Sequence, residues 1–142
     1  MSEKEAAVTT VPDRPKSLLL INDDLFLSTR IMSVLKGLEV EATLARNLDE
    51  AITHIQEKKP EIVMVNLNSL NLGGVEAVWA AKAVGAKRIL AFINHTRISE
   101  VKANALEVGA ERIVANSAVN ARLPVILKSM MHREPPVPED EE

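Results

Sequence analysis

The chain has 142 residues and a formal net charge of −3, and 46% of its residues are hydrophobic while only 2% are aromatic. This length and composition indicate one globular domain with a core of aliphatic side chains. The chain has no cysteine, which excludes disulfides and thiolate chemistry and makes the cytoplasm the expected compartment. No apolar run approaches the roughly 20 residues of a membrane span, and no signal peptide is expected.

Tails are predicted at both ends of a domain that spans residues 17–132. Residues 1–16 are polar and are predicted to form a flexible N-terminal tail. Residues 133–142 carry one positive and five negative side chains, so they are predicted to form an acidic disordered tail. This leaves the rest of the chain close to neutral, which argues against nucleic-acid binding because that function needs clustered Lys and Arg.

Short apolar runs alternate with helical patterns along the domain, which is typical of parallel strands joined by right-handed crossovers. The predicted strands are residues 17–22, 39–45, 61–66, 87–93 and 111–115. The helices between and after them are predicted from these apolar faces: Leu27, Ile31, Val34 and Leu35; Leu48, Ala51, Ile52 and Ile55; an alanine-rich stretch before Gly85; Ile98, Val101, Ala105 and Val108; and Leu123, Ile126, Leu127 and Met130. The pattern predicts five βα units in one α/β domain.

Three local features refine these elements. Asn47 and Glu50 resemble a capping box, which predicts the start of the second helix. Pro124 fits near the first turn of the last helix, where a missing N–H is tolerated. Trp79 is predicted to be a partly buried packing residue, and His54 and His132 are predicted to lie on helix surfaces.

Four of the five apolar runs end in asparagine, at Asn22, Asn66, Asn94 and Asn116. If the runs are parallel strands, these residues gather at the carboxyl edge of the sheet, where open α/β sheets place their ligand sites. An amide donates and accepts hydrogen bonds, but it is a poor nucleophile and does not titrate near neutral pH. The edge therefore has the position of an active site without catalytic residues, and the chain is predicted not to be an enzyme.

Three stretches make residues 17–131 resemble a receiver domain of bacterial two-component response regulators. They are Leu-Ile-Asn-Asp-Asp at residues 20–24, the loop and helix start at residues 65–77, and the Gly-Ala turn at residues 108–113. The resemblance implies a flavodoxin-like, doubly wound (βα)5 fold with a five-stranded parallel sheet. It also implies a role in phosphorelay signalling, with a histidine kinase or another regulator as the protein partner.

The chain departs from this family at the positions that carry phosphorylation. The family's acidic pair falls on Asn22 and Asp23, with Asp24 as a stand-in, and its phosphoacceptor aspartate falls on Asn66. The family's Ser or Thr falls on Ile93, which Asn94 follows, its lysine falls on Asn116, and its switch aromatic falls on Ile113. An amide cannot form an acyl phosphate. Since Asp23 is the only certain carboxylate, we expect at most weak Mg²⁺ binding. No other cofactor is expected.

Three interpretations of this degenerate site stay open. The first is a pseudo-receiver that signals through protein–protein interaction without phosphorylation. The second is a regulatory domain that binds a small molecule at the asparagine-lined edge, and the third is a receiver phosphorylated weakly at Asp23 or Asp24. Both acids also suit capping of the first helix. The edge asparagines and Asn68 are expected to form hydrogen bonds with one another, with the backbone at the strand ends or with water. These hydrogen bonds are expected to hold the loops in one state.

The resemblance places the contact surface on the fourth helix, fifth strand and fifth helix, often between two copies of the chain. In this sequence the surface spans residues 97–131. Its charged side chains are Lys102, Glu107, Arg112, Arg122 and Lys128. This mixture of signs is compatible with salt-bridged pairing in a homodimer.

Overall fold

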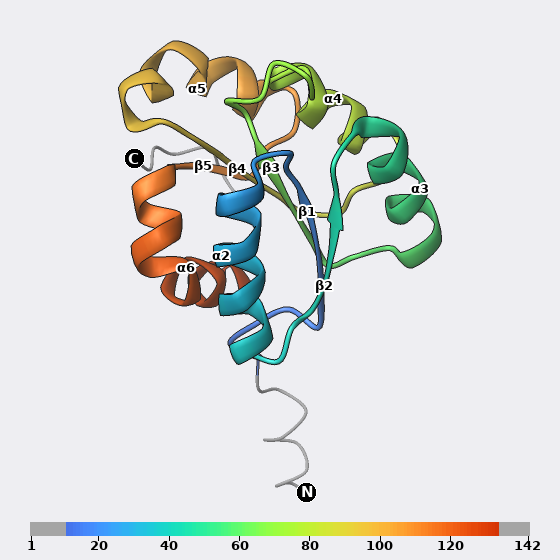
Figure 1. Cartoon of the computed structure of the whole chain (residues 1–142), viewed down its shortest axis with the longest axis vertical. Coiled ribbons are helices and arrows are strands. Elements are labelled where there is room, and N and C mark those ends of the chain that lie inside the picture. The colour runs from blue at the N-terminus through green and yellow to red at the C-terminus, as the bar shows by residue number, and fades with distance from the viewer. Residues whose placement is uncertain (1–10, 134–142) are drawn as a thin grey trace, which may run out of the picture.

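The computed structural model describes residues 11–133 and shows a single parallel sheet with helices on both faces (Figure 1). The strands are β1 (Ser17–Ile21), β2 (Glu41–Ala45), β3 (Ile62–Asn66), β4 (Ile89–Ile93) and β5 (Arg112–Ala115), in the order β2-β1-β3-β4-β5. The helices are α2 (Leu25–Gly37), α3 (Leu48–Lys58), α4 (Val75–Ala83), the 3-10 turn η1 (His95–Arg97), α5 (Ile98–Glu107) and α6 (Asn116–Met131). The predicted doubly wound, five-stranded flavodoxin-like fold is confirmed.

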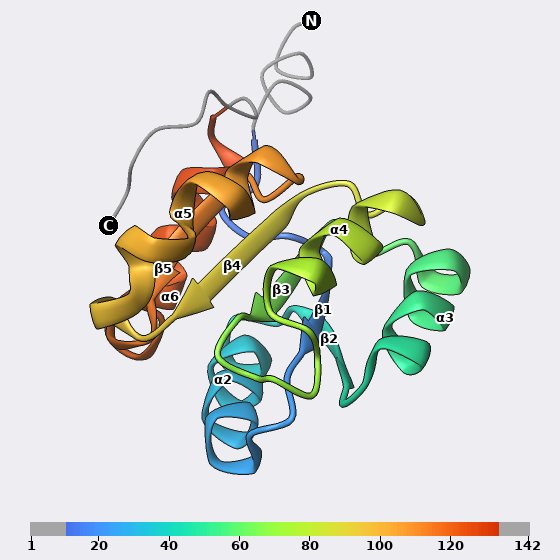
Figure 2. The ribbon, with the colours of Figure 1, turned by 90° about the horizontal axis from the view of Figure 1, so that it is seen from above.

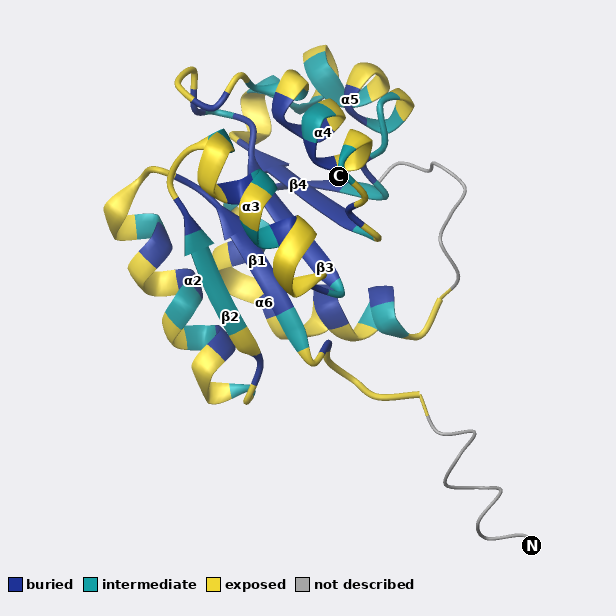
Figure 3. Cartoon of the chain, turned by 90° about the vertical axis from the view of Figure 1, so that its right-hand side faces the viewer, coloured by how far each residue is buried: buried dark blue, intermediate teal, exposed yellow. Residues whose placement is uncertain are grey.

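Two hydrophobic cores lie on opposite faces of the sheet. Alternate residues of one strand face opposite sides, so Leu19 packs with α3, α4 and α5, whereas Leu18 and Leu20 pack with α2 and α6. The views in Figures 1 and 2 show these two groups of helices on either side of the strands. The three central strands are buried almost throughout, while β2 is more exposed because it forms an edge of the sheet (Figure 3).

The predicted helix starts depend on side-chain caps that the structure contains. Asn47 Oδ1 accepts a hydrogen bond from Glu50 N at 2.9 Å, and Glu50 Oε1 accepts one from Arg46 N at 3.0 Å. This exchange confirms the capping box, with Glu50 reaching one residue further back than the usual partner. Asp24 Oδ1 accepts from Leu27 N at 3.1 Å, so Asp24 caps α2.

Two local expectations need correction. Pro124 lies inside α6, which starts at Asn116; Arg122 interrupts the helix with φ −140° and ψ 28°, so Pro124 falls in the first turn of the segment after the kink. Trp79 is 60% exposed and not a packing residue. Its neighbours Ala77 and Val78 take the core-facing positions of the short helix α4.

Polar contacts hold the segment before β1 to the residue that precedes β3 and to the residue that follows α6. Lys16 N donates to Glu61 Oε1 at 2.6 Å, and His132 Nε2 lies 2.8 Å from Asp13 Oδ1. Of the two predicted tails, residues 1–10 and 134–142 lie outside the described residues. Within residues 11–133, no helix is both long enough and apolar enough to span a membrane.

Candidate functional site

The four strand-end asparagines lie at the carboxyl edge of the sheet, but at different points of their elements. Asn66 is the last residue of β3, whereas Asn22 and Asn94 directly follow β1 and β4. Asn116 is the first residue of α6. Asn22 and Asn66 are buried at 0% and 4% exposure, and Asn94 is exposed.

Asn22 and Asn66 form the centre of a buried hydrogen-bond network. Asn66 Nδ2 donates to Asn22 Oδ1 at 2.7 Å, and Asn22 Nδ2 donates to Ser28 Oγ at 2.8 Å and to the Asp24 carbonyl at 3.1 Å. Asn22 Oδ1 also accepts from Asp24 N at 3.3 Å. Both hydrogens and the oxygen of the Asn22 amide are therefore used, which fixes the orientation of this side chain.

The network continues into the loop after β3. Asn66 Oδ1 accepts from Asn68 N at 2.8 Å, and Asn68 Oδ1 accepts from Asn94 N at 3.4 Å. We call Asn22, Asn66 and Asn68 the asparagine network. It links the end of β1, the end of β3 and the backbone after β4. Asn22 and Asn66 thus hydrogen-bond to each other, as expected from the sequence.

A second set of contacts holds the same loop to Asp23. Ser69 Oγ donates to Asp23 Oδ2 at 2.8 Å, and Asn71 Nδ2 donates to the same oxygen at 3.2 Å. Ser69 Oγ in turn accepts from Leu72 N at 3.2 Å. The Asp23 carboxylate, the one candidate metal ligand of the sequence, is thus engaged by two donors of the loop.

Sequence reasoning did not identify Ser28, Ser69 or Asn71 as site residues. Ser69 and Asn71 lie within residues 65–77, the stretch that resembles the phosphorylation loop, so the polar character of that loop was the available signal. Ser28 occupies the buried stripe of α2 together with Ile31 and Leu35. The available signal was a polar residue at a position where the helical spacing predicts a core side chain, since a buried hydroxyl needs a hydrogen-bond partner.

The side chains of Ile93 and Asn116, two further predicted site residues, make no hydrogen bond to the asparagine network. Ile93 is fully buried in the core. Asn116 Oδ1 is buried and has no hydrogen-bond partner within the described part of the chain. The β4–β5 half of the edge therefore carries the same residue type as the β1–β3 half without the same hydrogen bonds.

The residues at the edge do not fit a magnesium site. Magnesium prefers carboxylate and other oxygen ligands in near-octahedral geometry. Asp24 caps α2, Asp23 is bonded to the loop, and the amide oxygens of Asn22 and Asn66 already accept hydrogen bonds. Among residues 11–133, no three His, Cys, Asp or Glu side chains are grouped so that they could hold a metal ion.

The predicted interface residues all lie on α5, β5 and α6. Glu107, Arg122 and Lys128 fall on these elements, and so do Lys102 and Arg112. Arg122 and Lys128 are exposed, whereas Lys102 and Arg112 are half-buried. Charges of both signs are thus present on this surface. The structure contains one chain, so the pairing of two copies stays a prediction.

No protein-family model matches the chain, and no curated protein matches it. Solved structures do match. The response regulator domain of Thermotoga maritima CheB is 19% identical with a TM-score of 0.73, and the match covers 86% of this chain and 100% of that one. The receiver domain of a sensor histidine kinase from Pseudomonas aeruginosa, with magnesium in its active-site cleft, is 20% identical with a TM-score of 0.71 and coverages of 83% and 98%.

A third neighbour is the beryllofluoride-activated NtrC4 receiver domain dimer, at 16% identity and a TM-score of 0.72, with coverages of 82% and 96%. All three matches extend over nearly the whole described domain. At these identities the likeness establishes the fold and not the activity. The chain has the fold of a response-regulator receiver domain.

Proposed function

We propose that this protein is a degenerate receiver domain that acts in signal transduction by binding a protein partner, without being phosphorylated and without enzymatic activity. The observation that carries the proposal is the Asn66 amide at the position of the family's phosphoacceptor. Asn66 is 4% exposed, donates to Asn22 Oδ1 and accepts from Asn68 N. Its amide is a poor nucleophile, and both of its polar atoms already have protein partners.

The joint loss of acids and lysine supports the proposal on electrostatic grounds. In the family, the lysine and the carboxylates offset each other's charge. Loss of only the acids would leave a cation without partners, and loss of only the lysine would crowd like charges. With Asn22, Asn66 and Asn116 in place, the lysine is absent, and the remaining acids Asp23 and Asp24 accept hydrogen bonds from Ser69 and Leu27. The observed hydrogen bonds then give the loop after β3 one preferred conformation.

Exposed apolar side chains beside the asparagine network supply a surface for the partner. Leu25 and Phe26, in the first turn of α2, are 65% and 86% exposed, and Leu70 is 89% exposed. Leu70 lies between Ser69 and Asn71, which both bond to Asp23, so the loop holds Leu70 near the start of α2. Such grouped apolar exposure is typical of protein-binding sites. A histidine kinase or another cytoplasmic regulator is the proposed partner.

The α5–β5–α6 surface is the proposed contact between two copies of the chain. Its Glu107, Arg122 and Lys128 provide both signs of charge. One receiver domain of the same fold is a dimer, which supports pairing of two copies. The alternatives of a ligand at the asparagine-lined edge and of phosphorylation at Asp23 or Asp24 are not favoured, since hydrogen bonds within the protein already engage these groups.

The first test is an amide NMR titration of the full chain with Mg²⁺ and then with beryllofluoride, which mimics a phosphoryl group on aspartate. We expect weak Mg²⁺ effects near Asp23 at most and no response to beryllofluoride. Shifts at Asp23, Asn66 and Asn116 that spread to α5 and α6 would show that the switch works. Intact mass after acetyl phosphate treatment gives a second readout, and a mass gain of one phosphoryl group would overturn the proposal.

The second test addresses the partner surface. Proteins captured from a cell extract by the wild-type chain are compared with those captured by Phe26→Ser and by Trp79→Ser. Trp79 is the matched control because it is also an exposed aromatic residue, 60% exposed, but lies on α4. A specific partner should be lost with Phe26→Ser and kept with Trp79→Ser. Equal capture by both variants would rule out the α2 surface.

A further inference from the structure

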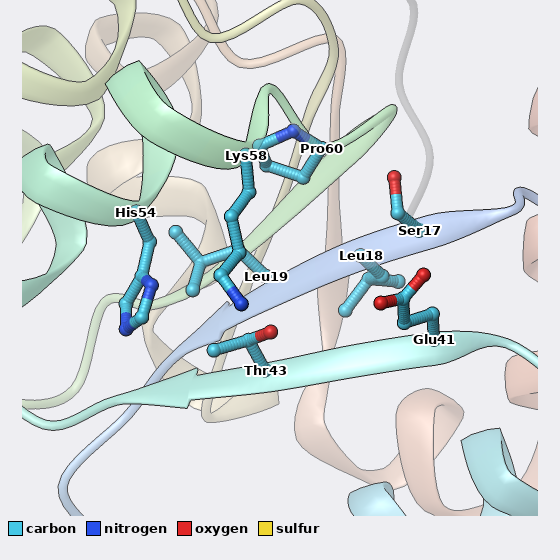
Figure 4. Close-up of a pocket in the computed structure, with 8 residues that line it drawn as sticks. All are labelled: Ser17, Leu18, Leu19, Glu41, Thr43, His54, Lys58 and Pro60. Atoms are coloured by element: carbon cyan, nitrogen blue, oxygen red, sulfur yellow. The ribbon is translucent and has the colours of Figure 1, made fainter.

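A cavity of about 270 Å³ lies between α3 and the β1–β2 edge of the sheet, toward the amino ends of the strands (Figure 4). Ser17 and Leu19 of β1, Glu41 and Thr43 of β2, and His54 and Lys58 of α3 contribute to its wall. None of these residues takes part in the asparagine network. The volume is close to the lower end of the range for small-molecule sites.

The sequence brings these residues together through two simple periodicities. In the parallel register Ser17 pairs with Glu41 and Leu19 with Thr43, and residues two apart on a strand point to the same face. His54 and Lys58 are four residues apart on α3, so they lie on one face of the helix. Figure 4 shows the His54 ring and the Lys58 side chain directed into the space above Leu19 and Thr43.

The cavity contains hydrogen-bonding groups that the protein itself does not satisfy. His54 Nδ1 is buried and has no partner within the described residues, although the sequence predicts His54 on a helix surface. Lys58 Nζ and Thr43 Oγ1 make no hydrogen bond or ion pair with any of residues 11–133. Since buried polar groups are normally hydrogen-bonded, His54 Nδ1 calls for an external partner, and the exposed Lys58 and half-buried Thr43 beside it are available to the same ligand.

The distribution of charge selects the kind of ligand. Lys58 supplies a cation on the α3 side, and His54 and Thr43 beside it supply hydrogen-bonding groups. Glu41 lies with Ser17 toward the other end, where its carboxylate disfavours a ligand with a second negative charge. Leu19 offers an apolar floor between the two ends. A single carboxylate on a short apolar body matches this pattern better than a phosphate dianion does.

We infer that the cavity between α3 and β2 binds a small organic monocarboxylate. The carboxylate accepts hydrogen bonds from Lys58 Nζ, Thr43 Oγ1 and the His54 ring, and the apolar body of the ligand contacts Leu19. Bonds from a cation to a carboxylate are the stronger class of hydrogen bond, so Lys58 is the main determinant of affinity.

The test is an amide NMR titration of the full chain with butyrate, compared with butyramide and inorganic phosphate. Butyrate should give saturable shifts concentrated at residues 17–19, 41–43 and 54–59, and butyramide should give none. Phosphate should bind more weakly than butyrate. Tighter binding of phosphate would overturn the assignment of a monocarboxylate, and unsaturable shifts spread over the surface would overturn the site.

Two variants and one control complete the test. Lys58→Gln should weaken butyrate binding about tenfold or more, and Thr43→Val should weaken it by a smaller factor while keeping the size of the side chain. Lys87→Gln removes the same charge from an exposed lysine outside the cavity and should leave binding unchanged. Spectral dispersion reports folding of each variant. Unchanged affinity in a folded Lys58→Gln protein would overturn the inference.

Discussion

The two halves of the carboxyl edge contain the same residue type in equivalent positions, yet only one half forms a network. In β1 and β3, Ile21 pairs with Val65, so the next residues, Asn22 and Asn66, lie opposite each other and bond at 2.7 Å. In β4 and β5, Ile93 pairs with Ala115, which places Asn94 and Asn116 in the equivalent relation. Nevertheless Asn94 is exposed, and Asn116 Oδ1 has no partner within residues 11–133.

The difference arises from the segment that comes after each strand. Three residues separate β1 from α2, and a long loop comes after β3. Backbone groups of these connections are therefore available to hydrogen-bond with the side chains of Asn22 and Asn66. β4 continues after Asn94 into η1, and α6 begins at Asn116 itself. Helix formation at or directly after these asparagines fixes their backbone, and Asn116 Oδ1 stays without a partner in residues 11–133. Register alone therefore does not determine whether two opposed asparagines bond.

The largest expected effect comes from breaking the closed half, which is the β1–β3 side of the edge. Asn22→Ala removes the hydrogen bonds to Asn66, Ser28 and Asp24, and the buried Asn66 Nδ2 and Ser28 Oγ lose these partners. We expect the free energy of unfolding to fall by about 2–4 kcal/mol, measured by urea denaturation. Asn94→Ala is the matched control and should change stability by less than about 0.5 kcal/mol, since Asn94 is exposed. Equal effects of the two variants would refute the comparison.

A smaller effect is expected from restoring the family's aspartate in the closed half. In Asn66→Asp, a carboxylate oxygen replaces the Nδ2 donor and faces Asn22 Oδ1. Burial and this acceptor raise the pKa of the new carboxyl above its unfolded-state value, so stability falls as pH rises between those two values. Relative to wild type, the variant should lose about 1–3 kcal/mol at pH 7 and less at acidic pH, where the carboxyl can donate.

The measurement is urea denaturation of both proteins across acidic and neutral pH. A stability difference that does not change with pH would show that the introduced carboxylate makes no repulsive contact with Asn22. Asn68→Ala is a useful companion, because it removes the acceptor of the 3.4 Å hydrogen bond from Asn94 N and leaves the bond between Asn22 and Asn66 intact.

The open half, on the β4–β5 side, should respond weakly. Asn116→Ala removes a buried amide oxygen that has no partner in residues 11–133, so its loss carries little penalty. We expect a change of less than about 0.5 kcal/mol in the free energy of unfolding. A loss comparable to that of Asn22→Ala, measured in the same urea series, would mean that the two halves are equally closed.

The smallest effect sharpens the contrast between buried and exposed hydrogen bonds. The hydrogen bond from His132 lowers the pKa of the exposed Asp13 carboxyl from its ordinary value of 3.8. A lowered pKa means that the contribution of this contact is present above that value and fades as pH falls through the folded-state pKa. In an NMR titration of the Asp13 carboxyl, His132→Ala removes the donor and should move the pKa of Asp13 toward 3.8. An unchanged pKa would show that the contact does not form in solution.

The sequence by itself determined the fold and predicted an edge with no phosphoacceptor aspartate at position 66. Alternating apolar runs and helical periodicities, with caps at Asn47 and Asp24, specify five βα units because each segment can bury only one way. The amide at Asn66 makes acyl-phosphate chemistry unavailable whatever its surroundings. These properties depend on residue type and local spacing, so they could be predicted.

Only the tertiary structure decided which of these residues contact one another. Asn66 bonds to Asn22 while Asn116 does not, Asp23 is engaged by Ser69 and Asn71, and Trp79 is exposed. The cavity beside His54 and Lys58 likewise depends on how α3 lies on β2. Such contacts join segments distant in sequence, and their geometry is set by strand register and helix placement, which local patterns do not encode.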